Sequence, residues 1–260
     1  MANATHVPNV DSSPLAPKAA IMTQFVLAAS IIASLKAGGY SDVEINDLQS
    51  AVRGFEQAVL PRKKEREAEA ENILRESRGR YTREILEEVF DIVDKGPIGP
   101  VRGAWFGETL SPHNRTNLYA LYSQPTANLN ALIDELRESG DLGYLGEWRR
   151  AGNRGMRTGA ATLFMYLYSP DRYNVWLPKT HGGLSRLRRL GDEFPKGGSE
   201  LSPDEYRVLY RAFNEHAIAV REENGFAPQI MDWFLFAVDE VKSNPANPGL
   251  RALIEGRMTP

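Results

Sequence analysis

Apolar residues recur every three or four positions along most of this sequence, and that spacing constrains the fold more than any other feature. In the first such segment they fall on one face of a helix, which Gly38 and Gly39 then end: Ile21, Phe25, Ala28, Ile32 and Leu35. Alternation typical of strands is rare, and residues 173–177 are the best short candidate. The sequence therefore predicts an all-α fold, a multi-helix assembly whose helices pack in antiparallel pairs.

Start and stop signals divide the chain into segments. Ser41 and Glu44 have the spacing of a capping box, and Pro61 breaks or kinks the helix that follows. Residues 62–80 carry dense mixed charge, which is typical of a solvated, salt-bridged helix. Apolar positions between Ile85 and Val93 predict another helix. Later helices are expected near residues 114–122, 127–139, 142–150, 158–168, 182–190, 203–223, 228–242 and 247–255.

Turn-forming residues suggest how these segments are grouped. The first 18 residues hold three prolines without apolar periodicity, so we expect a disordered tail there. Prolines and glycines are again dense between Pro97 and Gly103. The sequence thus predicts a tail at 1–18, an N-terminal helical region at 19–96 and a helical domain at 97–260.

Composition restricts the chemistry. The 260 residues include no cysteine, which excludes disulfides, thiolate nucleophiles and Cys-ligated zinc and suits a reducing compartment, so a cytoplasmic location is the default expectation. The apolar run at 19–35 is short for a membrane span, and no membrane partner is expected. The four histidines lack metal-ligand spacing. We therefore expect neither a metal nor a cofactor.

Positive charge is concentrated in one stretch of an otherwise acidic chain. The formal net charge is −3, yet residues 145–190 hold nine basic residues against Glu147 and Asp171, a local net charge of +7. Eight of the nine are arginines, whose planar fork suits bidentate contacts with phosphate. Such an asymmetry predicts a local anionic partner.

A glycine-rich run, Gly152 to Gly159, leads directly into the helix expected at 158–168. Unpaired backbone N–H groups and the helix dipole favour a phosphate there. The alternative is a helix start in which small residues, Gly159, Ala160 and Ala161, pack against a neighbouring element. Neither a nucleotide P-loop nor a dinucleotide fingerprint is present in the sequence.

The run from Gly155 to Trp176, with Gly183–Gly191 after it, resembles the helix-hairpin-helix-like segment of McrB-type restriction proteins. Ala104–Gly107 and Asp232–Phe236 are similar to the flanks of that segment, so the resemblance covers about residues 100–240. Arg157 stands where the hairpin pattern has its second glycine, and the GTPase module of such systems is absent from this sequence. The resemblance implies a DNA-binding or specificity region, standalone or part of a longer protein.

The candidate site follows from this segment. Phosphate contacts are predicted for Arg149, Arg150, Arg154, Gly155, Arg157, Thr158, Gly159, Arg172, Lys179, Arg186, Arg188 and Arg189. Contacts to a base are considered for Tyr173, Trp176, His181 and Trp105, with core packing as the alternative for the rings.

Three functions remain open at this point. The sequence favours a non-enzymatic DNA-binding module of a restriction or phage-defence system, working with a nuclease or NTPase partner. A second possibility is an α-helical protein-interaction scaffold with a basic face. A third is a helix-hairpin-helix DNA glycosylase, in which Asp171 would be the catalytic carboxylate. The oligomeric state is not predicted.

Overall fold

The computed structural model of the protein describes residues 26–94, 127–150, 158–191 and 201–257. Over these residues the regular secondary structure is entirely helical, which confirms the predicted all-α fold. The helices are α1 (Ala29–Ala37), α2 (Asp42–Ala58), α3 (Leu60–Glu76), α4 (Arg83–Asp94), α6 (Ala127–Glu138), α7 (Gly143–Arg150), α8 (Thr158–Tyr168), α9 (Pro178–Arg186), α10 (Pro203–Asn224), α11 (Pro228–Ser243) and α12 (Pro248–Ile254).

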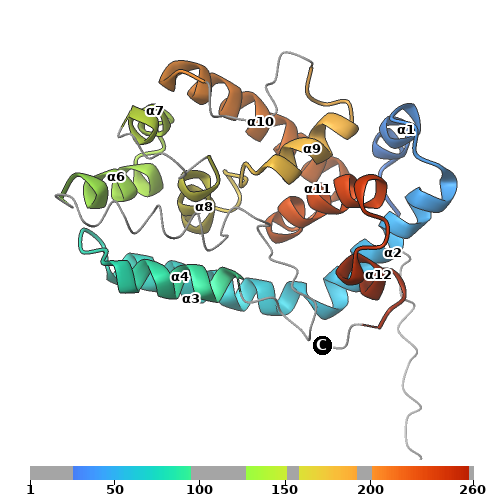
Figure 1. Ribbon diagram of the computed structural model, residues 1–260, viewed down its shortest axis with the longest axis horizontal. Helices are drawn as coiled ribbons and strands as arrows, with labels where there is room; N and C mark the ends of the chain where they lie inside the picture. The colour runs from blue at the N-terminus through green and yellow to red at the C-terminus, as the bar shows by residue number, and fades with distance from the viewer. Residues whose placement is uncertain (1–25, 95–126, 151–157, 192–200, 258–260) are drawn as a thin grey trace, which may run out of the picture.

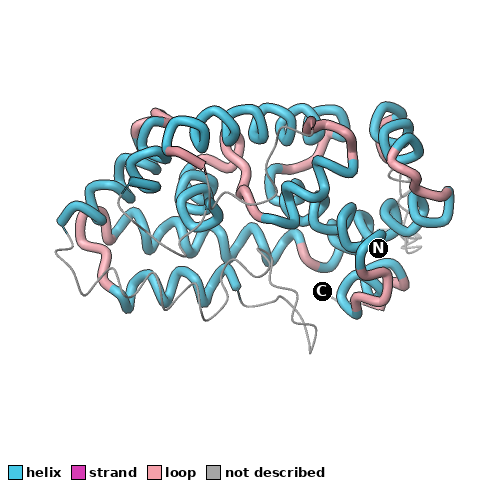
Figure 2. Tube along the Cα trace, turned by 45° about the horizontal axis from the view of Figure 1, so that its top comes forward, coloured by secondary structure: helices cyan, strands magenta, loops and turns pink. Residues whose placement is uncertain are grey.

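Helices far apart in the sequence lie side by side (Figures 1 and 2). α3 and α4 form a hairpin along one edge, with α6 and α8 above it, and α10 runs along the opposite edge. α9 packs on α11, and α12 packs on α2. Among the helices of the described ranges, none combines the length and apolarity that crossing a lipid bilayer requires.

One connected core joins the parts of the chain. Buried apolar side chains form a single cluster that extends from Leu27 to Leu253. Helices on the two sides of residue 96 share it, because α11 and α12 pack on α2 and α8 packs on α3. The glycine- and proline-rich boundary at 97–103, the tail at 1–18 and the helix expected at 114–122 lie outside the described residues.

Local start signals act as their chemistry predicts. Ser41 caps α2 in a complete capping box with Glu44. The chain breaks at Val59, between α2 and α3, and Pro61 occupies the first turn of α3, where a missing N–H costs no hydrogen bond. These boundaries depend on neighbours in the sequence alone.

The helix expected at 182–190 is displaced by four residues. α9 begins at Pro178 and ends at Arg186, so it includes Gly182 and Gly183, which the sequence pattern places at a helix start. The reason is tertiary: a Cβ on Gly183 would lie 2.2 Å from the carbonyl oxygen of Leu235 in α11. Two helices that approach so closely need glycine at the crossing, whatever its helix propensity.

The strand candidate at 173–177 is wrong, because the segment is a buried extended loop. Its backbone groups form hydrogen bonds with side chains instead of with a neighbouring strand. The amides of Asn174 and Trp176 donate to Asn214 and Thr162 over 2.8 and 3.0 Å. The Thr180 hydroxyl accepts from the amide of residue 177 and donates to the carbonyl of residue 175. Polar side chains thereby satisfy backbone groups that burial removes from water.

The charged helix predicted at 62–80 is largely exposed, but one of its faces is buried. Lys63 and Glu67 of α3 are buried, on the same helical face as Ala70 and Leu74. Burial of such groups is costly unless they are paired. Lys63 pairs with Asp232 of α11, and Glu67 contacts Lys63 and the Tyr166 hydroxyl of α8. The rest of α3 is largely exposed, as the charge pattern predicts.

Candidate nucleic-acid interface

The candidate interface begins where α7 ends. α7 closes with Arg149 and Arg150 in its last turn, and α8 begins eight residues later at Thr158. Arg154, Gly155 and Arg157 lie between them, in residues 151–157, outside the described part of the chain. The two helices flank the connection, and the hairpin itself stays a prediction.

The first turn of α8 packs into the protein. Gly159, Ala160 and Ala161 are buried, which is the packing alternative for this small-residue run. Trp148 of α7 makes an edge-on contact with Phe164 of α8, with ring centroids 6.1 Å apart. Buried aromatic contacts of this kind hold the two helices in a fixed relation. The first turn of α8 carries no acidic residue, so its positive dipole end is not neutralised from within the helix.

The two arginines of α7 differ in exposure. Arg149 is partly buried and donates its Nε hydrogen to the carbonyl oxygen of Leu201, 3.3 Å away. Arg150 is half exposed and pairs with Glu147, one turn earlier in α7. An exposed pair of this type is worth little in water, so Arg150 remains able to meet a phosphate.

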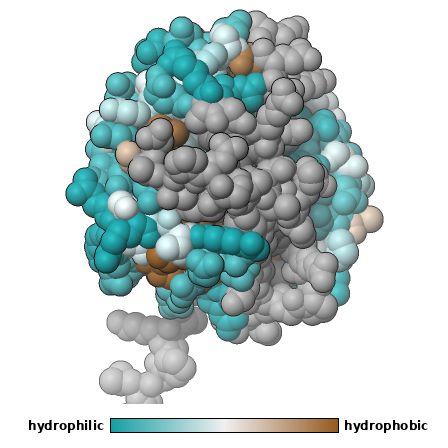
Figure 3. Space-filling view, turned by 60° about the vertical axis from the view of Figure 1, so that its left-hand side comes forward, coloured by the Kyte–Doolittle hydropathy of each residue, from teal (hydrophilic) through white to brown (hydrophobic). Residues whose placement is uncertain are grey.

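Acidic residues limit the interface on the other side of α7. The nearby carboxylate of Glu135 raises the pKa of Tyr144 most, followed by desolvation, the hydrogen bond that the Tyr144 hydroxyl donates to Glu135, and the charges of Asp141 and Glu147. A phosphate at this face would be repelled. The described part of the surface at this end of the molecule is largely hydrophilic, with small apolar areas (Figure 3). In α7 the positive charge lies at the C-terminal end, at Arg149 and Arg150.

Lys179 and Arg186 are partly exposed and are engaged in ion pairs with α11. Lys179 lies 3.2 Å from Asp239 and 2.6 Å from Glu240, and Arg186 lies 2.7 Å from Asp239. Burial alone would raise the pKa of Asp239, but the hydrogen bonds from Arg186 and Lys179 outweigh it and lower that pKa below its usual value. These two cations thus fasten α9 to α11, and their charge is offset by that of α11.

The remaining cations of the segment also differ in whether they have an acidic partner. Arg189 pairs with Glu223 at 2.8 Å. Within the described ranges Arg172 and Arg188 form no ion pair, and both are exposed; the Arg172 guanidinium lies over the ring of Tyr173, 5.3 Å from its centroid. Arg188 has a left-handed backbone conformation, with φ of 56°.

The cationic segment does not form one surface. Arg149 contacts residue 201, just before α10 starts, whereas Arg189 pairs with Glu223 in the last turn of α10. α10 has 22 residues, so its two ends are about 33 Å apart. Figure 1 shows the same separation, with α7 at one end of the molecule and α9 ending beside α1. The predicted single face is thus corrected to two groups, because α8 and the buried loop carry the chain through the core between them.

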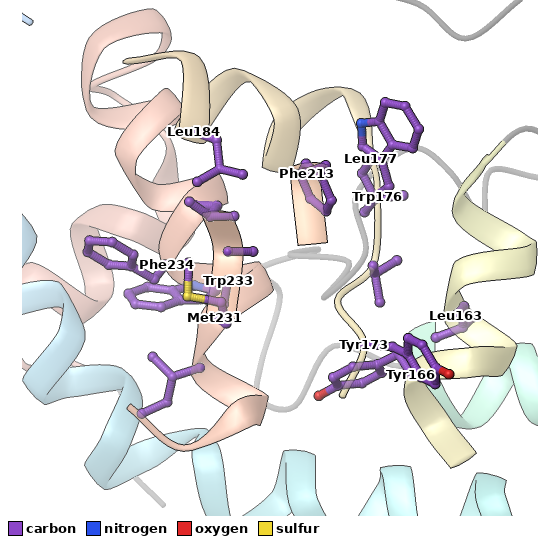
Figure 4. Close-up of a cluster of buried hydrophobic side chains, with 14 of the residues drawn as sticks. Leu163, Tyr166, Tyr173, Trp176, Leu177, Leu184, Phe213, Met231, Trp233 and Phe234 are labelled. Atoms are coloured by element: carbon purple, nitrogen blue, oxygen red, sulfur yellow. The ribbon is translucent and has the colours of Figure 1, made fainter. Parts of the chain in front are cut away.

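The rings considered for base contact are in the core. Tyr173, Trp176 and His181 are each at most 5% exposed. Trp176 stacks on Phe213 at a centroid distance of 5.6 Å, as Figure 4 shows, and donates to Nδ1 of His181 over 3.3 Å. Core packing therefore describes these three rings, and stacking on a base would require the core to open. Trp105 lies outside the described residues.

The turn that holds Asp171 is part of the scaffold. Its backbone carbonyl and that of Pro170 accept hydrogen bonds from Arg221 of α10, 2.9 and 3.2 Å away. The side chain of Asp171 itself is exposed on the surface. A cluster of three or more His, Asp or Glu side chains able to hold a metal is absent from the described ranges.

Sequence reasoning missed a second polar site. Lys63, Glu67, Tyr166 and Asp232 meet in the core, where α3, α8 and α11 converge. The signal in the sequence was the spacing of residues 63, 67, 70 and 74, which continues one helical face through the charged run. That spacing alone names no partner for the two charges.

Comparison with protein-family models, with curated proteins and with solved structures finds no match to this chain.

Proposed function

We propose that the protein binds duplex DNA through its phosphate backbone, as the DNA-binding module of a restriction or phage-defence system. One observation carries the proposal: four arginines fall within the nine residues 149–157, between two helix ends that are packed into the core. The other cations of the segment lie elsewhere in the fold, and three of them have acidic partners. Along the sequence, positive charge is therefore densest at the end of α7 and in the residues that lead to α8.

The chemistry of this stretch fits a phosphate backbone better than base edges. Arginines at a helix end neutralise phosphates and release condensed counterions, which gives affinity without sequence readout. Of the rings considered for base contact, the three that the structure describes, Tyr173, Trp176 and His181, are in the core. The resemblance to McrB-type restriction proteins supports the assignment to a defence system, in which a nuclease or NTPase partner would cut or translocate the DNA.

A salt titration tests the proposal. Fluorescence anisotropy with a labelled duplex of about 20 base pairs gives the dissociation constant at several salt concentrations. We expect measurable binding near 50 mM salt, with a log-log slope of several units. Arg154→Ala/Arg157→Ala should reduce that slope by roughly two units, because each lost phosphate contact removes about 0.9.

Arg188→Asn provides a matched control. It also removes one exposed positive charge, but at the other end of α10, and asparagine tolerates the left-handed backbone conformation there. Its slope should equal that of the wild type. Binding that is undetectable near 50 mM salt would exclude the proposal. A loss in the control of about half that in the double variant, in proportion to the charges removed, would mean that the attraction is a general one, as for a scaffold with diffuse charge.

A further inference from the structure

A cluster of titratable side chains lies in the core where α3, α8 and α11 meet. Lys63 donates to Oδ1 of Asp232 and to the carbonyl oxygen of Gln229, over 2.5 and 2.8 Å. Its Nζ is 3.5 Å from Oε1 of Glu67. The hydroxyl of Tyr166 donates to Oε2 of Glu67 over 2.8 Å. One side chain from each of α8 and α11 is thereby tied to α3.

The charges in this cluster do not balance. Lys63, Asp232 and Glu67 are 0%, 3% and 5% exposed, and they bring one cation against two carboxylates. Oδ2 of Asp232 is buried without a hydrogen-bond partner, and Oε1 of Glu67 has only the long contact with Lys63 at 3.5 Å. An ionised carboxylate can only accept, so acceptors this poorly paired in the core are costly. A single proton would neutralise the excess charge and convert one acceptor into a donor.

Among the residues that the structure describes, the groups acting on Glu67 leave one carboxylate charge in excess. Lys63 on its own helix, Asp232 from α11 and Tyr166 from α8 are the groups that act on its carboxyl, and Arg221 from α10 acts on Tyr166. α4 also packs on α3, and its buried face is apolar, with Leu86, Val89, Phe90 and Val93. On α2, Glu56 is partly buried, and burial is the cause that raises its own pKa.

We propose that this cluster binds one proton in the folded protein, and that the docking of α8 and α11 on α3 is therefore weakened when the pH rises. Burial raises the pKa of the Glu67 carboxyl to about 7, with Asp232 adding to the rise and Lys63 and Tyr166 opposing it. Burial likewise raises the pKa of Asp232. Two carboxyls that share one cation titrate as a pair, so the proton belongs to the cluster rather than to one residue.

The sign of the effect follows from linkage. The ordinary pKa of Glu67 is 4.5, so the folded state holds a proton that the opened state releases. The contribution of this bound proton to the free energy of unfolding is complete below about pH 4.5, declines between pH 4.5 and 7, and is lost above pH 7. Near neutral pH a modest alkaline shift puts a second negative charge in the core and loosens α8. This inference is independent of the proposed DNA binding.

Amide hydrogen exchange across pH 5 to 8 tests it on the whole protein. Exchange rates in α8 and α11, corrected for the intrinsic pH dependence of exchange, give the equilibrium constant for local opening. In the wild type this constant should increase by up to about tenfold per pH unit until about pH 7 and then level off. Glu67→Gln resembles the protonated form, so its opening constant should stay flat over the same range.

Two further variants sharpen the comparison. Glu69→Gln removes an exposed carboxylate from the same helix and should retain the wild-type pH dependence. Asp232→Asn leaves one cation and one carboxylate, so Glu67 should ionise without a proton to release and the pH dependence should fall to that of Glu67→Gln. A pH dependence in Glu67→Gln equal to that of the wild type would overturn the proposal.

A direct titration of the carboxyl groups in the wild type tests the proposal without relying on a variant that could fail to fold. In the wild type, the carboxyl carbon resonance of Glu67 reports its protonation by NMR, without any substitution. We expect its midpoint, or that of Asp232 if the shared proton resides there, to lie well above the ordinary value of a carboxyl group. Midpoints near 4 for both carboxyls would overturn the proposal as well.

Discussion

Gly183 of α9 lies so close to Leu235 of α11 that a Cβ atom added at position 183 would be only 2.2 Å from the carbonyl oxygen of Leu235. The two helices can approach this closely because position 183 has no side chain. The contact fixes the register of α9 and thereby the ends of the buried loop before it.

Gly183→Ala should therefore destabilise the protein, although alanine is the better helix former. The added methyl group meets backbone rather than a flexible side chain, so the helices must separate, at a cost of about 3 kcal/mol or more in the free energy of unfolding. Urea denaturation measures the loss. Ser185→Ala, at an exposed position of the same helix, is the control and should change stability by less than about 0.5 kcal/mol. Equal stability of both variants would contradict the close contact.

Lys63→Met should destabilise the protein by about 3 to 5 kcal/mol, because it leaves two buried carboxyls without a cation. Lys64→Met, at the exposed neighbouring position, should have a small effect. Adding Glu67→Gln and Asp232→Asn to Lys63→Met should recover part of the loss, since uncharged groups replace the unpaired charges. Thermal denaturation of the four proteins would show whether the cost arises from charge, and a triple variant less stable than Lys63→Met would argue for packing instead.

Trp176→Ala should act on stability and leave DNA binding intact. The indole is 4% exposed and stacks on neighbouring rings, so its removal is expected to cost about 3 to 5 kcal/mol. The salt dependence of DNA binding, measured at a temperature where the variant is folded, should match the wild type. A selective loss of affinity in a stably folded Trp176→Phe variant would instead support a contact between Trp176 and a base.

Asp239→Asn should change the response to acid. The hydrogen bonds from Arg186 and Lys179 hold the pKa of this carboxyl below its ordinary value of 3.8, although burial opposes them. Its stabilising effect, about 1 to 2 kcal/mol for charge-assisted bonds, is thus present above pH 4 and is lost as the pH falls through the lowered pKa. The difference in unfolding free energy between wild type and variant should shrink on acidification. A difference that is constant from pH 7 to 2 would contradict the ion pairs.

Local chemistry explains what the sequence predicts correctly. The α2 start at Ser41, the break at Pro61 and the helical class of the fold depend on residues within a few positions of one another. Such signals require no knowledge of tertiary contacts. The ends of α9 differ because its register depends on α11, some 50 residues later in the chain.

The candidate site was harder to predict for a related reason. Charge counted along residues 145–190 treats neighbours in sequence as neighbours in space, whereas α8 and the buried loop separate Arg149 from Arg189 by the length of α10. Lys63 likewise appears as part of a solvated run until its partner Asp232, 169 positions away, is known. Periodicity identifies the buried face of a helix, but it does not identify what the opposing helix brings to it.

The buried loop at 173–177 constrains how this sequence can evolve. Its backbone depends on side chains from three different helices: Thr162 of α8, Thr180 of α9, and Tyr210 and Asn214 of α10. Replacing one of them would leave a buried amide or carbonyl group without a hydrogen-bond partner. The apolar residues around the loop, by contrast, can be exchanged for others of similar volume. We therefore expect divergent descendants of this chain to retain those polar residues together, even where the surrounding hydrophobic sequence has drifted beyond recognition.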